Sequence, residues 1–207
     1  MATVLNRPEQ QVILRVSWDT YERLLTEHEQ SNGIRFTFDQ GVLEIVVPSL
    51  EHETLNSRIE TLVELLADEM EIDFERTRST TFRRKDLEKG FEPDSSFYIR
   101  NVQRVRGKKQ LDLRKDPPPD LVIEIDITNS CLDKLPIYSA VGVAEIWRYS
   151  GEGLTILRLD DHAYVRRPES LVLPNITASA LNNFIRSGQQ LKRSIWTKRV
   201  REWARAL

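Results

Sequence analysis

Hydrophobic and polar positions along this chain follow two different periods, and each period predicts one kind of secondary structure. Four apolar residues of segment 51–70 recur at helical spacing, which predicts an amphipathic helix. They are Leu55, Ile59, Leu62 and Leu66. Segments rich in Val, Ile, Phe and Tyr between turn residues are typical of strands. Such segments lie at residues 12–16, 34–38, 42–47, 95–99, 120–127, 144–149, 154–159 and 163–168, and a further strand is expected from Ile72.

Turn and capping residues mark where these elements begin and end. Ser17 is the expected N-cap of a helix over residues 18–30. Asp39-Gln40-Gly41 separates two strand-like segments, which predicts a hairpin with a three-residue turn and a bulge. Pro136 lies in the first turn of a helix that is expected to end at Gly142. The three strands after residue 143 are expected to be antiparallel neighbours, followed by a helix over 178–187.

This mixture of helices and strands predicts an α/β (α+β) protein with a mixed β-sheet flanked by helices, an N-terminal hairpin and a C-terminal helix. We expect one domain over residues 1–207, because this length is ordinary for a single core. Its core would cover about 12–165, and a helical extension would follow at about 175–207.

Composition narrows the class of protein. The chain is 40% hydrophobic and 30% charged with a formal net charge of −2, so no global attraction draws it to nucleic acid. One cysteine excludes an internal disulfide, and we expect Cys131 to be a small buried residue near a helix start. No apolar run spans a membrane and no secretion signal is recognisable, so a cytoplasmic location without membrane contact is expected.

The stretch 117–134, PPPDLVIEIDITNSCLDK, carries the candidate chemistry. Strand side chains alternate between two faces, so one face here is aliphatic and the other carries three carboxylates. The aliphatic residues are Leu121, Ile123, Ile125 and Ile127, and the acidic residues are Asp120, Glu124 and Asp126. Carboxylates in a row resist burial unless a cation or hydrogen-bond donors offset them. The alternative is a half-exposed edge strand whose acids are solvated.

Lys134 follows Glu124 by ten positions, where the chain turns into a predicted helix. A lysine near a carboxylate cluster suits metal-assisted phosphodiester hydrolysis. The acids would hold a hard divalent cation, and the ammonium would stabilise negative charge or orient the attacking water. Asp94, like Asp120, directly follows a proline at the start of a predicted strand.

Glu51 and His52 open the helix predicted at 51–70 and are accessory candidates. Either side chain could reach the side of the sheet that carries the acids. Glu51 also fits a first-turn acid favoured by the helix dipole. His52 also fits a capping histidine whose hydrogen bonds are satisfied locally.

Two segments are basic. Residues 100–116 contain seven Lys or Arg and two Asp, which suits either a solvated loop or an arm that contacts phosphates. The candidate contacts are Arg104, Arg106, Lys108 and Lys109. The tail 191–207 is also basic but has an apolar stripe, which favours helix docking over nucleic-acid contact, although the two can coexist. That stripe consists of Trp196, Val200, Trp203 and Leu207, and it is the feature that hints at a homodimer.

The order of these elements resembles the PD-(D/E)XK nuclease superfamily and, more narrowly, the Uma-two family of small restriction endonucleases. The resemblance covers roughly residues 12–165, and its combination of motifs is fairly specific. The residues that carry it are Asp39–Leu43, Pro48–His52, Glu92-Pro93-Asp94, Pro119–Ile125, Ser130, Lys134, Tyr138, Gly142-Val143 and Glu145–Trp147.

The resemblance implies a restriction-endonuclease-like core with a divalent-metal site. Asp94 matches the aspartate of the PD motif, and Glu124 matches the second acid. The chain departs from the signature two residues after Glu124, where Asp126 stands in place of lysine, and Lys134 matches the lysine of the Uma-like pattern. Asp126 would then be a further metal ligand or an acid that orients other groups.

The implied function is a Mg²⁺- or Mn²⁺-dependent endonuclease with DNA as its substrate. The missing lysine after Glu124 and the two basic segments favour an alternative. That alternative is a non-catalytic nucleic-acid-binding or interaction module on a nuclease-like scaffold.

Overall fold

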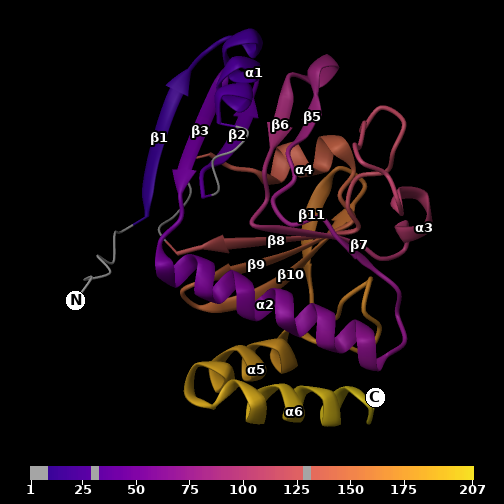
Figure 1. Ribbon diagram of the computed structural model, residues 1–207. Helices are drawn as coiled ribbons and strands as arrows, with labels where there is room; N and C mark the ends of the chain where they lie inside the picture. Colours follow the sequence, from indigo (N-terminus) through magenta and orange to yellow (C-terminus); the bar gives the residue numbers. More distant parts are fainter. Residues whose placement is uncertain (1–8, 29–32, 128–131) are drawn as a thin grey trace.

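The computed structural model describes residues 9–28, 33–127 and 132–207, so Ser130 and Cys131 lie outside the described residues. Two β-sheets frame this part of the chain (Figure 1). Sheet A is antiparallel in the order β1-β3-β2-β6-β5. Its strands are β1 (Gln10–Arg15), β2 (Arg35–Asp39), β3 (Val42–Val47), β5 (Phe82–Arg84) and β6 (Lys89–Phe91).

Sheet B is mixed, in the order β11-β10-β9-β8-β7-β4, and its one parallel pair is β8 with β9. Its strands are β4 (Glu75–Arg76), β7 (Ser95–Tyr98), β8 (Leu121–Asp126), β9 (Glu145–Ser150), β10 (Gly153–Asp160) and β11 (Ala163–Arg167). The helices are α1 (Trp18–Glu27), α2 (Leu50–Glu69), α3 (Val102–Val105), α4 (Leu135–Val141), α5 (Ala178–Gln190) and α6 (Arg193–Ala204), with a 3₁₀ turn at Lys85–Leu87.

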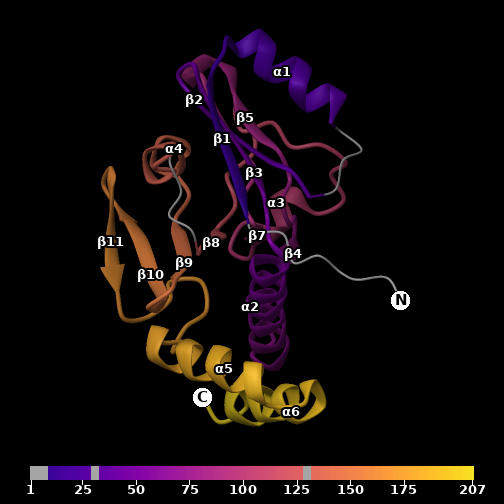
Figure 2. The same cartoon turned by 90° about the vertical axis from the view of Figure 1, so that its left-hand side faces the viewer.

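The helices cover both sheets and confirm the expected mixed sheet flanked by helices. Helix α1 packs its aromatic residues on β2 and β3 of sheet A. Helix α2 runs across one face of sheet B, α5 packs against both α2 and β10, and α6 packs against α2 and α5 (Figures 1 and 2). Helix α4 and strands β5 and β6 enclose a second core on the other face of sheet B.

The predicted local patterns are largely confirmed. The apolar stripe of α2 is buried, and Ser17 caps α1 by accepting a hydrogen bond from the Thr20 N–H at 3.2 Å. Strands β9, β10 and β11 are antiparallel neighbours as expected. Helix α4 begins with Pro136 in its first turn and ends at Gly142, where φ is +84°.

The hairpin of β2 and β3 differs from its prediction in the turn. Asp39 pairs directly with Val42, so the loop has two residues rather than three, and no bulge is needed. Gln40 and Gly41 both adopt positive φ, at 47° and 86°. Two residues in this conformation match the twist of the flanking strands, which is why short hairpins prefer it.

Two predicted segments turned out differently. The strand expected from Ile72 is reduced to β4, and the basic residues after it form the hairpin of β5 and β6. That hairpin joins sheet A through β2, and its Phe82 and Phe91 are buried. The segment 100–116 contains the short helix α3, held by buried Val102 and Val105. In both cases distant packing partners decide the structure.

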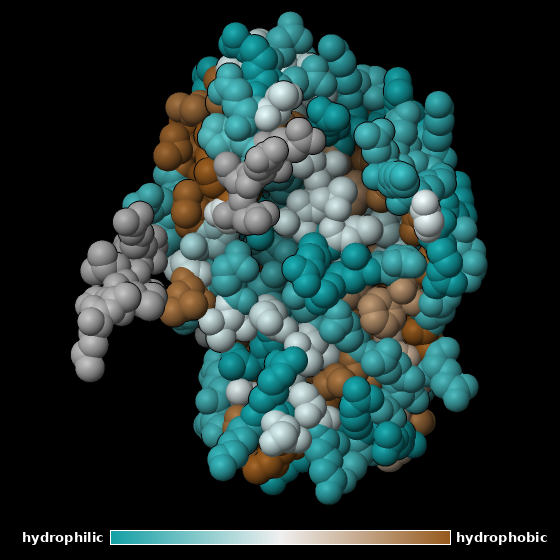
Figure 3. Space-filling view, viewed as in Figure 1, coloured by the Kyte–Doolittle hydropathy of each residue, from teal (hydrophilic) through white to brown (hydrophobic). Residues whose placement is uncertain are grey.

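The basic tail docks as expected. Trp196 and Val200 of α6 are buried against α2 and α5, whereas Leu207 is 47% exposed. The hint of a homodimer therefore loses its basis, because most of the stripe is used within the chain. An exposed aliphatic patch instead lies on β1 and the end of β3 (Figure 3). It consists of Val12, Leu14 and Val47, and Ile13 is exposed on the other face of β1.

None of the described helices combines the length and the apolar character that a membrane crossing would require.

Candidate metal and active-site cavity

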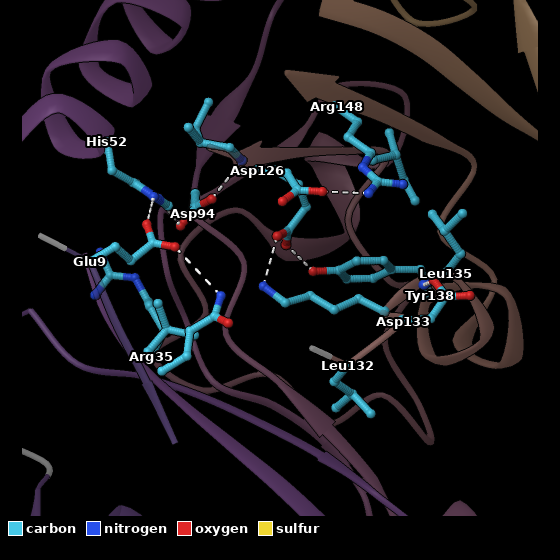
Figure 4. A pocket seen from close by; sticks show the side chains of 16 residues that line it. Glu9, Arg35, His52, Asp94, Asp126, Leu132, Asp133, Leu135, Tyr138 and Arg148 are labelled. Atoms are coloured by element: carbon cyan, nitrogen blue, oxygen red, sulfur yellow. Dashed lines mark hydrogen bonds and ion pairs between the residues drawn. The ribbon is translucent and has the colours of Figure 1, made fainter. Parts of the chain in front are cut away.

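A cavity of about 350 Å³ lies between sheets A and B at the end of β8 (Figure 4). The alternation of β8 creates it: Leu121, Ile123 and Ile125 face the core under α2, and Glu124 and Asp126 face the cavity. The expected separation of an aliphatic face from an acidic face therefore holds at this end of the strand.

Antiparallel pairing brings Asp94 to the same place. Ser95 of β7 pairs with Ile123 of β8, so Asp94, one residue earlier, lies beside Glu124. The Ile125 N–H donates a hydrogen bond to Asp94 Oδ2 at 2.8 Å, which fixes the carboxylate at the cavity wall. Asp94 and Glu124 are only 6% and 8% exposed.

Helix α4 supplies two donors to Glu124. Lys134, the N-cap residue, places Nζ 2.8 Å from Glu124 Oε2. Tyr138 lies one turn later on the same helix face, and its hydroxyl donates a hydrogen bond to Glu124 Oε1. Both oxygens of the carboxylate therefore have a donor, and the lysine turns toward the acids rather than toward solvent.

The charges of this cluster shift the pKa values of its members. Burial lowers the pKa of Lys134, but the negative charges of Glu124, Asp94 and Glu44 outweigh it, and the pKa is raised. Burial raises the pKa of Glu124, Lys134 lowers it and Asp94 raises it, with a net upward shift. Lys134 is therefore held as an ammonium ion, and burial together with the charge of Asp94 disfavours the ionised form of Glu124.

His52 joins the same cluster from the first turn of α2. Its Nε2 lies 2.8 Å from Asp94 Oδ1, and its Nδ1 lies 2.6 Å from Glu9 Oε2. Burial opposes a charge on the ring, but Asp94 and then Glu9 raise the pKa of His52 to about 9. The imidazolium thus bridges two carboxylates, while the backbone cap of α2 comes from Ser49.

The same charge holds Asp94 ionised. Burial raises the pKa of Asp94, but the hydrogen bond and charge of His52, followed by the charge of Lys134, lower it below its ordinary value. Asp126 also faces the cavity, where it forms an ion pair with Arg148 of β9.

Other predicted site residues lie elsewhere. Asp120 begins the opposite end of β8, where it accepts hydrogen bonds from the Ile99 and Asn101 N–H groups at 2.8 and 2.9 Å. It therefore holds a turn and does not line the cavity. Glu51 is exposed and also lies outside the cavity lining.

Segment 100–116, the candidate phosphate-contacting arm, lies at the other end of β7 and β8 from Asp94 and Glu124. It follows β7, which ends where β8 begins, so it lies far from the acids (Figure 1). Arg106 is paired with Asp73 at 2.6 Å, and Lys108 is paired with Asp116. Arg104 and Lys109 are exposed. This arrangement favours the alternative interpretation of the segment, a solvated loop.

Sequence reasoning missed several residues of the cavity. Glu9 directly precedes β1 and lines the cavity, and Glu44 of β3 acts on Lys134 through its charge, but nothing in the local pattern relates either residue to β8. Arg148 lies in the strand-like segment AEIWRY, whose pattern does not indicate that its side chain faces a site. Tyr138 differs, because it is one of the residues that carry the family resemblance and it lies four residues after Lys134, one helical turn away.

The donor set of the cavity fits a hard divalent cation. Asp94 and Glu124 offer carboxylate oxygens side by side in a buried site. Across residues 9–28, 33–127 and 132–207, no three side chains of His, Cys, Asp or Glu are placed to hold a metal ion together. Zinc needs three or four protein ligands. Mg²⁺ is held by one or two carboxylates, with waters and substrate phosphates as its other ligands, and Mn²⁺ has the same preference for oxygen.

Comparisons with known proteins bear on the fold and the family of the chain. A crystal structure described as "a putative nuclease belonging to DUF820 from Anabaena variabilis ATCC 29413" has a similar fold, with a TM-score of 0.50 and 14% sequence identity. The match covers 72% of this chain and 90% of that chain. No curated protein matches the chain. The family model Uma2, described as "Putative restriction endonuclease", matches residues 18–191, and the chain therefore belongs to the Uma2 family.

Proposed function

We propose that this protein is a Mg²⁺- or Mn²⁺-dependent endonuclease that hydrolyses phosphodiester bonds of DNA. The observation that carries the proposal is the convergence of Asp94, Glu124 and Lys134 on one cavity between the two sheets. The family description and the fold of the Anabaena variabilis protein support the nuclease class.

In this proposal Asp94 and Glu124 would hold the cation. A metal bound there would polarise a phosphate oxygen and lower the pKa of a bound water. Lys134 would neutralise negative charge that develops on the phosphate, or orient the attacking water. Asp126, held by Arg148, would border the site as a further acid.

The charge balance of the cavity explains how such acids can be buried. Burying an ionised carboxylate without a partner costs on the order of several kcal/mol of folding free energy, because the charge loses its hydration. Here His52 compensates Asp94 and Lys134 compensates Glu124. Each acid oxygen keeps a second lone pair, so a cation can add to the carboxylates without removing these donors.

Cleavage assays with matched variants test the proposal. Purified protein is incubated with supercoiled and linear DNA and Mg²⁺ or Mn²⁺. We expect Asp94→Ala and Lys134→Ala to lower the cleavage rate at least about 100-fold. Asp68→Ala and Lys109→Ala remove one exposed acid and one exposed lysine outside the cavity and should cut like the parent. Equal cutting by all four variants, or no cutting by the parent, would contradict the proposal.

One observation favours a second candidate, a nucleic-acid-binding module without catalysis. All four oxygens of Asp94 and Glu124 already contact a donor in the described part of the chain. Calorimetric titration with Mg²⁺ separates the two. Binding that is lost in Asp94→Ala and Glu124→Ala supports the nuclease, whereas metal-independent DNA binding without cutting supports the module.

A further inference from the structure

Two arginines lie at the junction of α2, α5 and α6 without an acidic partner in the described part of the chain. Among the described residues, neither Arg58 of α2 nor Arg193 of α6 forms an ion pair, and Arg193 donates a hydrogen bond to Thr61 Oγ1 at 3.4 Å. The remaining tail arginines near α2 differ, because Arg201 and Arg205 both bind Glu69. The charge of the first pair is therefore not neutralised within the described chain.

Neighbouring residues restrict the position of the Arg58 side chain. A Cβ added to Gly188 of α5 would lie 2.8 Å from Arg58 Cδ and 2.9 Å from Trp196 Nε1. Trp196 itself is buried and donates its Nε1–H to the Phe184 carbonyl at 2.8 Å. The absence of a side chain at position 188 thus leaves room for the arginine stem, which cannot move inward.

Two hollows border this arginine. One, of about 530 Å³, is lined by Thr54, Ser57 and Arg193, among others. The other, of about 520 Å³, is lined by residues that include Ile127 and Tyr149. Glu53 lines the first hollow, but its carboxylate is bound to Arg35 at 3.3 Å. The first hollow is therefore the one that both guanidinium groups border, whereas the second is lined by Arg58 and by the exposed carboxylate of Glu51.

The electrostatics favour such an anion. Burial, and then the positive charge of Arg193, lower the pKa of Arg58 from its ordinary value. Two guanidinium groups that repel each other become stable neighbours when one anion accepts hydrogen bonds from both. Phosphate oxygens suit this role, since the planar guanidinium can bind two of them at once.

The second hollow extends from Arg58 to the strand ends that also carry the cavity. Ile127 and Tyr149 directly follow Asp126 and Arg148, the ion pair at the cavity rim. Successive strand residues face opposite sides of a sheet. The hollow and the cavity therefore lie at the same end of β8 and β9, on opposite faces of sheet B.

We propose that Arg58 and Arg193 bind a backbone phosphate of nucleic acid that flanks the phosphodiester held in the cavity. The choice of nucleic acid rests on the proposed function, whereas the phosphate chemistry rests on the two arginines. Such a contact positions the substrate without reading bases. It accounts for local attraction of a polyanion by a protein whose formal net charge is −2.

The test is the binding of short duplex DNA by the full chain in EDTA, measured by fluorescence anisotropy between about 50 and 200 mM salt. Arg58→Gln and Arg193→Gln should each weaken binding about three- to tenfold and lower the slope against log salt by about 1. The loss should be equal for two duplexes of unrelated sequence. Gly188→Ala keeps both charges but displaces Arg58, and it should weaken binding as Arg58→Gln does. Arg199→Gln, an exposed arginine of α6, is the matched control and should bind like the parent.

Each outcome decides the proposal. Unchanged affinity in Arg193→Gln, whose exposed side chain can be replaced without disturbing the core, would overturn it, as would an equal loss in Arg199→Gln. Thermal stabilisation by inorganic phosphate that needs Arg58, with unchanged DNA affinity, would assign a free-phosphate site instead. Weaker DNA binding by both variants without cutting by the parent would sustain this site and remove the nuclease. DNA cutting by the parent, together with unchanged DNA binding by both variants, would support the nuclease and overturn the phosphate site.

Discussion

Pro93-Asp94 and Pro119-Asp120 are the same dipeptide, each directly before a strand of sheet B, yet their aspartates have different surroundings. Asp94 lies beside the His52 imidazolium at 2.8 Å, on the cavity that also holds Lys134. Asp120 accepts three hydrogen bonds from neutral groups, the N–H groups of Ile99 and Asn101 and the Asn101 side chain at 2.6 Å. One aspartate is surrounded by charges, and the other holds a turn together.

The difference follows from strand direction. Strands β7 and β8 are antiparallel, so the residue before β7 and the residue before β8 lie at opposite ends of the pair. Only the start of β7 coincides with the end of β8, where Glu124 faces the cavity. The role of the aspartate in this dipeptide therefore depends on the strand topology around it.

The largest expected effect comes from removing the charge of Asp94 alone. Asp94→Asn keeps an acceptor for the Ile125 N–H but cannot hold a cation as a carboxylate does. We expect DNA cleavage to fall about 100- to 1000-fold, measured as the rate of plasmid nicking in Mg²⁺. The matched variant Asp120→Asn should retain the parental rate. Comparable losses in the two variants would erase the distinction drawn between the aspartates.

Truncating Asp120 should lower the stability of the fold rather than the activity. Asp120→Ala leaves three donors near the Ile99 turn without their acceptor, which should cost about 3 kcal/mol of unfolding free energy. Urea denaturation measures this loss, and cleavage per folded molecule should stay at the parental level. A stable Asp120→Ala protein that no longer cuts DNA would mean that this acid belongs to the active site.

The two surroundings should also differ in their response to pH. The pKa of His52 is raised to about 9 in the folded protein, above its unfolded value of 6.5. Protonation of the ring therefore stabilises the fold fully below pH 6.5, and this contribution is lost as the pH rises through 9. In EDTA we expect a loss of about 2 kcal/mol between pH 7 and 9, measured by urea denaturation.

His52→Gln removes the titrating ring and is the control for this slope. The variant should be less stable at pH 7 and should lack most of the decline toward pH 9. A slope that persists in His52→Gln would assign the pH dependence to another group.

The smallest expected effect concerns Glu124, the partner of Asp94 across the strand pair. Tyr138→Phe removes one of its donors and should lower the unfolding free energy by about 1 kcal/mol. It should also raise the pKa of Glu124 further and weaken Mg²⁺ binding in calorimetry, because Tyr138 lowers that pKa.

Tyr164→Phe is the matched control for this variant. Its hydroxyl donates to the Val143 carbonyl at 2.6 Å, outside the cavity. A similar loss of stability is expected, with Mg²⁺ binding unchanged. If both variants bound Mg²⁺ equally well, the hydroxyl of Tyr138 would have no bearing on the metal site.

Predictions from local patterns succeeded where neighbours in sequence carry the physical cause. The stripe of α2, the alternation of β8 and the αL residue Gly142 each depend on a few adjacent positions. Predictions failed where a residue far away in the sequence decides the local structure. The hairpin of β5 and β6 is an example, because it joins sheet A through the pairing of β6 with β2. The turn at Gln40-Gly41 shows that a hairpin can be predicted correctly while its loop length and register are known only from the strand pairing.

The sequence by itself determined that Glu124 and Asp126 share one strand face and that Lys134 stands at the start of the next helix, because alternation and helix start depend on local geometry. The tertiary structure decided that Asp94 rather than Asp120 joins them and that His52 bridges Asp94 to Glu9. It also placed the basic loop of residues 100–116 at the opposite end of sheet B. The reason is that strand order and direction bring together residues far apart in the chain, and no local pattern encodes which ends will meet.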